Sequence, residues 1–412
     1  MASHNETRQR AREANISAIL SQESANFAPF IPWDSRNPSA GMIPQRYSVE
    51  NRVVDLTEVQ PQTSFSPAAF FGGAPMSFKL STNDLSIIDH AFLVFKVTNS
   101  TGGAVVTPPT AFWFNKIAVR APNGNTITEV RDIDSWLSQL MLARTDHESI
   151  SALVNSTDAY LTTGNSLANG ASVELYLPLF TLFNACRLHL PGINGDLELF
   201  VEPKPSAMTL VSGTHPTVTS ATLLLAGVDE AQERRNRRTQ EYRGRIPHFL
   251  PFYAWNHFTQ ALTLAAGIKS DVKLSGLKGQ FSALFVLVRA LPLTAATQGT
   301  FIKLDEHSVR DQSGQIFCGN HAKTHERSRI IAGADLHNLA AKNSNFYMVP
   351  FSGTVVHDFI TGQVHGYQVF GGNETLSITP TTGTASGQYQ VDVVALQSTA
   401  LRIQGGEVSL RQ

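Results

Sequence analysis

Residue types that bind metals gather in one stretch of the chain, "CGNHAKTHE". Cys318 is followed by His321 after two residues and by His325 after three more, and Glu326 comes next. Thiolate, imidazole and carboxylate groups are the usual zinc ligands, and a zinc site needs several of them to converge. No second Cys/His cluster occurs later in the sequence. We therefore interpret the stretch as a polar loop with scattered histidines and predict no bound metal.

A pair of carboxylates offers a second kind of chemistry. Asp132 and Asp134 lie close in sequence, and two carboxylates are the machinery of glycoside hydrolysis. They also open the stretch "DIDSWLSQLMLAR", whose apolar residues follow helical spacing, at Ile133, Trp136, Leu137, Leu140 and Met141. Acidic side chains are favoured at a helix start, where they cap free N–H groups and oppose the helix dipole. We therefore predict a helix capped by Asp132 or Asp134 rather than a catalytic pair.

Other catalytic and cofactor-binding patterns do not occur in the sequence. It contains no phosphate-binding glycine loop and no nucleophile elbow. A cupin-type metal site is disfavoured, because no His-x-His followed by Glu lies on a strand pattern. We predict a protein with no catalytic residues, no cofactor and no enzyme activity.

The composition narrows the classes of partner. Only 16% of the 412 residues are charged, against about 25% in an average soluble domain, and the formal net charge is −1. Such a chain does not attract nucleic acid by its overall field, so we predict no sequence-specific nucleic-acid binding. No apolar run reaches the roughly 18 residues of a membrane span, and Cys186 and Cys318 could form only one disulfide. We expect an intracellular product held together by packing alone.

The elements that would position these residues are mostly strands. From about residue 50 onward, short apolar runs alternate with turn signals, which is typical of antiparallel sheets. "DLELFVE" predicts a half-buried strand, because Leu197, Leu199 and Val201 alternate with polar residues. "AFLVFKV" is nearly continuously apolar, and we expect this strand to be covered on both faces.

Two segments do not fit the strand pattern. Residues 1–45 are predicted to form an arm. Ile16, Ile19 and Leu20 could share one face of a short helix, whereas the prolines of the following "NFAPFIPWDSRNP" exclude regular structure there and its aromatic residues need cover. The arm's candidate contact residues are Arg8, Arg10, Arg12, Ile16, Ile19, Leu20, Phe27, Phe30 and Trp33. "DEAQERRNRRTQEYRG" has strong helix formers, almost no apolar face and a closing glycine, so we interpret 229–248 as a solvated helix or linker. This division leaves 46–228 and 249–412 as two domains.

The two domains repeat one pattern of motifs. "VRAPNGNTI" from Val119 returns as "VRDQSGQI" from Val309, each turning through a glycine. In the same order, "KLS", a Tyr…Pro motif and a proline-terminated strand also recur, about 170 to 195 residues apart, as expected of a tandem repeat with loop insertions. Each copy holds about eight antiparallel strands, and jelly rolls are the usual eight-stranded sandwiches. We predict an all-β chain of two tandem eight-stranded antiparallel jelly rolls with short helical insertions and an extended N-terminal arm.

Four stretches carry a family resemblance. They are "LPLFTLFNACRLHLPGINGDLELFVE", "GQFSALFVLVRA", "YMVPFSGTVVHDFITGQVHGYQVFGGNETLSI" and "VDVVALQSTALRIQGGEV". In this order, and across nearly the whole chain after residue 50, the sequence resembles the double jelly-roll major capsid proteins. That lineage includes adenovirus hexon and the coat proteins of tailless membrane-containing phages, virophages, polinton-like viruses and large eukaryotic DNA viruses. The chain departs from the larger members in lacking long tower insertions.

The resemblance implies a structural role in a virion. It implies a homotrimer whose six jelly rolls form a pseudo-hexagonal capsomer of an icosahedral DNA virus shell, made and assembled inside the host cell. The implied partners are the chain itself, penton or vertex proteins, and minor capsid proteins. An internal membrane stays open as a further partner, and the arm would lie on the inner side of the shell.

Two other classes of function remain as alternatives. A tandem β-sandwich could be a carbohydrate-binding or receptor-binding, spike-like protein, because such proteins also use tandem jelly rolls. A sandwich-fold glycosidase or metal-dependent cupin is the third class. A stable mass of three subunits would favour the capsid protein, whereas a monomer retarded on a polysaccharide column would favour the lectin.

Overall fold

A computed structural model of the chain describes residues 51–62, 70–71, 74–80, 85–143, 165–179, 188–230, 232–319, 345, 347–351, 355 and 368–410. Several residues considered above lie outside this part of the chain: Arg8, Arg10, Arg12, Ile16, Ile19, Leu20, Phe27, Phe30, Trp33, Cys186, His321, His325 and Glu326.

The first half of the chain folds into two facing four-stranded antiparallel sheets. Their strand orders are β1-β10-β3-β8 and β2-β9-β5-β6, so the chain crosses repeatedly from one sheet to the other, as in a jelly roll. The strands are β1 (Asn51–Val59), β2 (Met76–Leu80), β3 (Ile87–Thr98), β5 (Phe114–Arg120), β6 (Thr126–Arg131), β8 (Ser172–Pro178), β9 (Leu197–Pro203) and β10 (Thr217–Glu230).

The second half repeats this topology position by position. Its sheets have the orders β11-β19-β13-β16 and β12-β18-β14-β15, while β17 (Gln368–Phe370) pairs with β13 and β20 (Glu407–Leu410) with β19. The strands are β11 (His248–Leu264), β12 (Ser270–Lys273), β13 (Gly279–Ala290), β14 (Leu304–Arg310), β15 (Ile316–Gly319), β16 (Tyr347–Pro350), β18 (Thr375–Pro380) and β19 (Gly387–Gln404). The predicted fold of two tandem eight-stranded jelly rolls is confirmed.

Smaller elements connect the strands. A two-stranded sheet of β4 (Val105–Thr107) and β7 (Asn165–Leu167) extends the first roll. The helices are η1 (Thr110–Trp113), α4 (Asp132–Ala143), η2 (Leu190–Gly192), α7 (Ser206–Thr209) and α8 (Gln232–Arg243). Within the described residues, none of the helices has the length and apolar character needed to cross a bilayer.

The repeat extends to individual residues. Strands β5 ("FNKIAVR") and β14 ("LDEHSVR") have the same order of buried and exposed positions. The turns that follow them place Gly124 and Gly314 at φ values of 83° and 86°, a region that glycine enters without steric cost. Pro178 and Pro350 end their strands at matching positions, where a missing N–H costs least.

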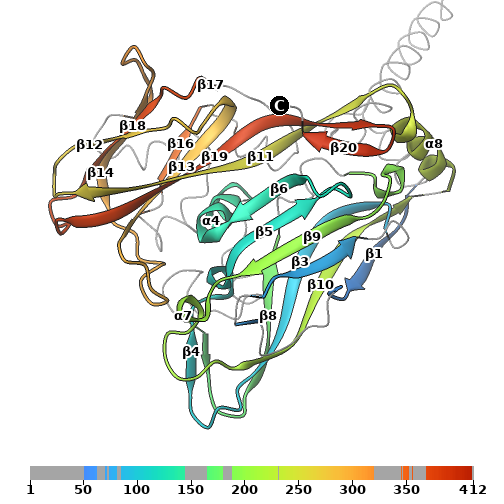
Figure 1. Ribbon diagram of the computed structural model, residues 1–412, viewed down its shortest axis with the longest axis horizontal. Helices are drawn as coiled ribbons and strands as arrows, with labels where there is room; N and C mark the ends of the chain where they lie inside the picture. Colours follow the sequence, from blue (N-terminus) through green and yellow to red (C-terminus); the bar gives the residue numbers. More distant parts are fainter. Residues whose placement is uncertain are drawn as a thin grey trace, which may run out of the picture.

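The two rolls pack against each other through unlike surfaces. The outer face of the β11-β19-β13 sheet lies against α4 and the edge strand β6 of the first roll (Figure 1). One hydrophobic cluster fills the first roll and continues into Phe252, Phe285 and Leu396 of the second, whereas Leu284 and Val286 belong to the second roll's own interior. Because neighbouring residues of a strand point to opposite faces, β13 is buried on both sides.

The expectation for "AFLVFKV" is wrong for one face of β3. Leu93, Phe95 and Val97 point into the first roll and are fully buried. On the opposite face, however, Phe92 and Val94 are only half-buried and Lys96 is exposed. No described element covers that outer face as α4 and β6 cover its counterpart in the second roll.

The interpretation of the linker as a solvated helix is also wrong for one face. The segment does form a helix, α8, but Arg238 and Tyr242 are buried against the first roll. Beneath α8, the imidazole Nδ1 of His189 lies 2.9 Å from Glu230 Oε2, and Arg238 Nη1 lies 3.3 Å from Glu230 Oε1. A buried carboxylate with two such partners anchors the helix, although the helix lacks an apolar stripe.

Candidate functional site

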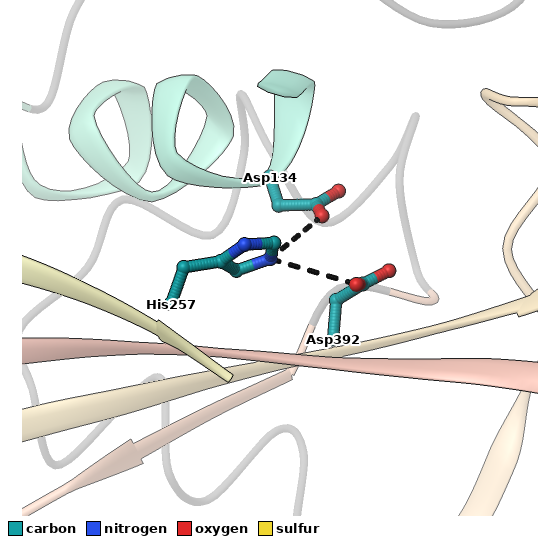
Figure 2. A group of neighbouring side chains, drawn as sticks. All are labelled: Asp134, His257 and Asp392. Carbon is teal, nitrogen blue, oxygen red and sulfur yellow. Dashed lines mark ion pairs between the residues drawn. The ribbon is translucent and has the colours of Figure 1, made fainter. Parts of the chain in front are cut away.

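The most unusual chemistry of the described residues lies at the contact between the rolls. Six ionisable side chains converge there: Asp132 and Asp134 from the first turn of α4, Lys204 after β9, His257 on β11, Arg289 on β13 and Asp392 on β19. Figure 2 shows how His257 points between the carboxylates of Asp134 and Asp392, which come from different rolls.

The guanidinium group of Arg289 is the centre of this cluster. Its Nη2 lies 2.6 Å from Asp392 Oδ2, 3.0 Å from Asp134 Oδ2 and 3.6 Å from Asp132 Oδ2. Its Nη1 donates to the backbone carbonyl of Gln298 at 3.4 Å. Arg289 is fully buried, and because arginine keeps its charge in proteins, the three carboxylates must balance it.

His257 joins the same two carboxylates from the other side. Its Nε2 lies 3.3 Å from Asp134 Oδ2 and 3.5 Å from Asp392 Oδ1. Burial alone would lower the pKa of His257, but the hydrogen bonds and negative charges of Asp134 and Asp392 raise it to about 9. His257 therefore carries a proton at neutral pH.

Asp132 occupies a backbone conformation that few residues adopt. Its φ is 52°, in the left-handed region that Asp tolerates better than most side chains. The Ile133 N–H donates to its Oδ1 at 2.7 Å, and the Lys204 ammonium also donates to Oδ1. Burial raises the pKa of Asp132, but the charges of Lys204 and Arg289 outweigh burial and leave the pKa below its usual value.

Asp134 and Asp392 differ in the direction of their pKa shifts although they share the same cations. Burial raises the pKa of Asp134 to about 6, an effect that Arg289 only partly offsets and that the charge of Asp392 reinforces. Burial also raises the pKa of Asp392, but hydrogen bonding to His257 and the charge of Arg289 lower it well below its usual value. Thr259 and Gln390 also donate to Asp392, at 2.9 and 2.8 Å.

Three side chains of the cluster are of types that bind metal ions. Asp134, His257 and Asp392 each offer a ligand atom, and these atoms lie within 4.8 Å of one another. However, a divalent cation would displace the proton of His257 and would meet the positive charges of Arg289 and Lys204. With protonated His257, three cations already balance three carboxylates, so the arrangement suits an ion-pair network better than a metal.

The same geometry assigns a role to the carboxylates that the sequence analysis considered. Asp132 bonds the first free N–H of α4, as a residue at a helix start does, whereas Asp134 faces the second roll. Asp134 is fully buried beneath Arg289 and His257, so a sugar cannot reach it. Of the "CGNHAKTHE" stretch, the described part places Cys318 in β15, opposite Val309, rather than in a loop.

Four members of the cluster were not predicted from the sequence: Lys204, His257, Arg289 and Asp392. Two of them had a readable signal. Arg289 ends the apolar run "FSALFVLVRA" and Asp392 interrupts "VDVVAL", and opposite charges inside neighbouring buried strands are expected to pair. Lys204 lies between two prolines and His257 within the aromatic stretch "FYAWNHF", and nothing in these surroundings points to a charge partner. Only the packing of the rolls brings them to the cluster.

Comparisons with known proteins identify the fold. No protein-family description matches the sequence, and no curated protein is significantly similar to it. Solved structures do match. A capsid chain of PBCV-1 virus has a TM-score of 0.60 at 15% identity, covering 88% of this chain and 98% of that chain. The Faustovirus major capsid protein has a TM-score of 0.58 at 9% identity, covering 97% and 98%.

A third match is more distant. The structure of Sulfolobus turreted icosahedral virus includes a chain with a TM-score of 0.51 at 11% identity, covering 84% of this chain and 90% of that one. The chain has the fold of viral major capsid proteins. This double jelly-roll places the charged cluster at its internal seam, between the two rolls.

Proposed function

We propose that the chain is the major capsid protein of an icosahedral DNA virus, a structural protein of the virion without enzyme activity. The fold supports this proposal, because its length and topology match those of viral capsid chains nearly end to end. A difference between two equivalent sheet faces supports self-association. The outer face of the β11-β19-β13 sheet is covered within the chain, whereas no described element covers that of the β1-β10-β3-β8 sheet.

The contact inside the chain provides a template for self-association. In the first roll, α4 and the edge strand β6 cover the outer face of the β11-β19-β13 sheet. The counterpart of β6 in the second roll is β15, which is likewise the edge strand of its sheet. In an assembly, β15 could therefore pack on a sheet face of a second copy in the same way that β6 packs on the second roll of its own chain.

The receiving face would be the outer face of the β1-β10-β3-β8 sheet. Leu224 pairs with Phe92 on the neighbouring strand, so these two side chains lie side by side on the same face. Val94 and Tyr176 form the next such pair. Leu224, Phe92, Val94 and Tyr176 are half-buried, an apolar surface of the kind found at the centre of protein contacts.

Repetition of the contact has a geometric consequence. A contact between unlike surfaces produces a closed ring when its rotation divides a full turn, and an open filament otherwise. If the contact between chains copies the contact within the chain and each contact turns by one sixth of a circle, six rolls close the ring, and six rolls are three chains. The proposed capsomer is thus a homotrimer with pseudo-sixfold edges, and its interfaces should bury more than about 2,000 Å².

Further partners follow from the same proposal. Trimers would contact one another in the shell, penton or vertex proteins at its corners, and minor capsid proteins or an internal membrane at its inner side. The arm of residues 1–45 is proposed to make inner contacts through Arg8, Arg10, Arg12, Ile16, Ile19, Leu20, Phe27, Phe30 and Trp33. Deletion of residues 1–45 should then leave trimers intact and impair shell assembly.

Native mass spectrometry of the full chain tests the proposal. We expect three subunits that resist dilution and salt. The double variant Phe92→Glu, Val94→Glu should give monomers, because it places two charges on the proposed receiving face. Val369→Glu is the matched control, since Val369 is 63% exposed on the second roll and outside that face. A wild-type monomer would overturn the proposal, and binding of that monomer to a polysaccharide would favour the carbohydrate-binding alternative.

A further inference from the structure

The six charged residues at the seam are more than a static bridge. We propose that they form a proton-operated latch, which tightens the contact between the two rolls when it takes up protons and loosens it when His257 loses its proton. The inference does not depend on the proposed capsid function, because it concerns one chain.

The latch draws its charges from both rolls. The first roll contributes Asp132, Asp134 and Lys204, which sum to one negative charge when all are ionised. The second contributes His257, Arg289 and Asp392, which sum to one positive charge only while His257 is protonated. Between about pH 6 and pH 9, where Asp134 is ionised, the attraction between the rolls at this point is therefore set by the proton of His257.

His257 is surrounded by charged groups from both rolls. The charged groups that face His257 are Asp134 of α4 and Asp392 of β19, and beyond these carboxylates lie Arg289 of β13, Asp132 of α4 and Lys204. The polar groups that complete the cluster are Thr259, Gln298 and Gln390. No further ionisable group of the described residues is paired with this cluster.

Water does not reach the centre of the latch. Asp134, Arg289 and Asp392 are fully buried, and the His257 side chain is 15% exposed. When His257 is neutral, three carboxylates face only Arg289 and Lys204, so one negative charge stays unbalanced in a medium of low polarity. Unbalanced buried charge is strongly unfavourable, and separation of the rolls relieves it by admitting water.

The direction of the pH effect follows from the two groups that titrate. The pKa of His257 rises from 6.5 to about 9 and that of Asp134 from 3.8 to about 6 when the rolls are in contact. The closed contact therefore binds more protons than the open one between about pH 4 and pH 9, and its stability falls as pH rises through this range. The lowered pKa values of Asp132 and Asp392 oppose this trend only below pH 4.

Thermal unfolding of full-length variants between pH 7 and pH 10 tests the latch. Wild type should be more stable than His257→Gln by about 3 to 5 °C at pH 7, and the difference should vanish by pH 10. His257→Lys keeps a positive charge in this range, so its stability should change less with pH than that of wild type. His248→Gln is the matched control, because His248 lies on the same strand outside the cluster and its variant should follow wild type.

Hydrogen exchange gives a local readout of the same contact. After correction for the intrinsic pH effect, the amides of α4 should exchange at least about tenfold faster at pH 9.5 than at pH 7 in wild type, and much less so in His257→Lys. Asp134→Asn is a second variant, which should remove the part of the pH dependence between pH 4 and pH 6.

Three outcomes would overturn the latch. The first is a stability difference between wild type and His257→Gln that stays constant with pH. The second is α4 exchange that responds to pH equally in all variants. The third is a pH profile that shifts when zinc is added or EDTA removes metal, which would make the cluster a metal centre. Native mass at pH 7 reports separately on the trimer, so failure of one proposal does not imply failure of the other.

Discussion

The outer faces of two equivalent sheets differ in one respect: in the second roll the outward side chains are buried under other elements, and in the first roll no described element buries them. Phe92 of β3 lies opposite Pro178, as Ala283 of β13 lies opposite Pro350, so the two strands can be aligned residue by residue. In the second roll the outward residues Phe285, Leu287 and Arg289 are all fully buried. Their counterparts in the first roll, Val94, Lys96 and Thr98, are half-buried or exposed.

The comparison shows that position in the fold does not determine burial. The same sheet face is a solvent-accessible surface in one roll and part of an internal core in the other, because α4 and β6 pack on only one of them. The residues match this difference, since Lys96 stands where the second roll has Leu287. Apolar residues nevertheless remain on the outer face of the first roll, among them Phe92 and Leu224. The proposed contact with a partner chain would explain them, because it would bury their side chains.

The largest expected effect concerns Arg289. Its replacement in Arg289→Ala leaves Asp132, Asp134 and Asp392 facing one another, and removing one partner of a buried pair typically costs about 3–5 kcal/mol. Urea unfolding measures this loss. Lys79→Met is the control, because the Lys79–Asp196 pair is largely exposed and should contribute less than about 1 kcal/mol. Equal losses in both variants would contradict the assignment of Arg289 as the centre of the seam.

The next effect compares matched apolar residues on the two faces. Phe285→Ala should destabilise the fold by about 3 kcal/mol, because it opens a cavity in the seam. Val94→Ala, at the equivalent position, should cost less than about 1 kcal/mol in a dissociated chain, since Val94 is only half-buried there. Denaturant unfolding at low protein concentration checks both. Similar losses would mean that the two faces are covered alike.

The third effect is a pH dependence at one pair of equivalent positions, where the second roll has a histidine and the first has an isoleucine. His307 of β14 occupies the position of Ile117 in β5, and burial lowers its pKa to about 4. A lowered histidine pKa contributes stability above about pH 6.5 that is lost as pH falls towards 4. At pH 5 wild type should therefore have lost about 2 kcal/mol relative to neutral pH through this group.

His307→Ile tests that expectation, because it restores the residue of the first roll. The variant should lose much of the acid sensitivity between pH 6.5 and pH 4, as measured by urea unfolding at several pH values. If the stability of His307→Ile falls with acid as much as that of wild type, the assignment to His307 is wrong. The latch has the opposite sign in this range through Asp134, so Asp134→Asn combined with His307→Ile separates the two contributions.

The smallest effect concerns Lys96. Lys96→Leu gives the first roll the residue that the second roll has at the same position, and an exposed substitution usually changes stability by less than about 0.5 kcal/mol. Thermal unfolding of the dissociated chain should show this small change. A loss above about 1 kcal/mol would show that Lys96 has a folded-state role beyond that of a surface residue.

The strands and their order were largely predictable from the sequence, because alternation and glycine turns are local signals. "DLELFVE" is β9 with Leu197, Leu199 and Val201 buried, as its pattern predicted. The start of β11 was not predictable in the same way. Its first half, "HFLPFYAWN", contains Pro251 and does not alternate, yet it pairs with β19 from His248 onward. A proline is tolerated there because β11 is the edge of its sheet.

The charged cluster was predictable only in part. Asp132 and Asp134 stood out by their spacing, but their cationic partners lie about 70 to 160 residues away in the sequence. Contacts over such separations depend on tertiary packing, which a local pattern does not report. The interpretation of α8 failed for a related reason. Its buried side chains are Arg238 and Tyr242, and a buried arginine shows no apolar periodicity. A helix that is held by buried charged residues is therefore missed by patterns based on hydrophobicity, whereas a charge inside an apolar strand, such as Arg289, can be noticed.

The unlike surfaces of the seam give each copy a direction. In the proposed assembly, each chain has a donor end, the edge at β15, and an acceptor end, the face around Phe92. Copies joined donor to acceptor circulate in one sense only, so the assembly has a fixed handedness and no mirror-related form. A copy with a blocked acceptor can still join as the last member but cannot close the circle, and a small admixture of such copies would arrest growth at incomplete arcs.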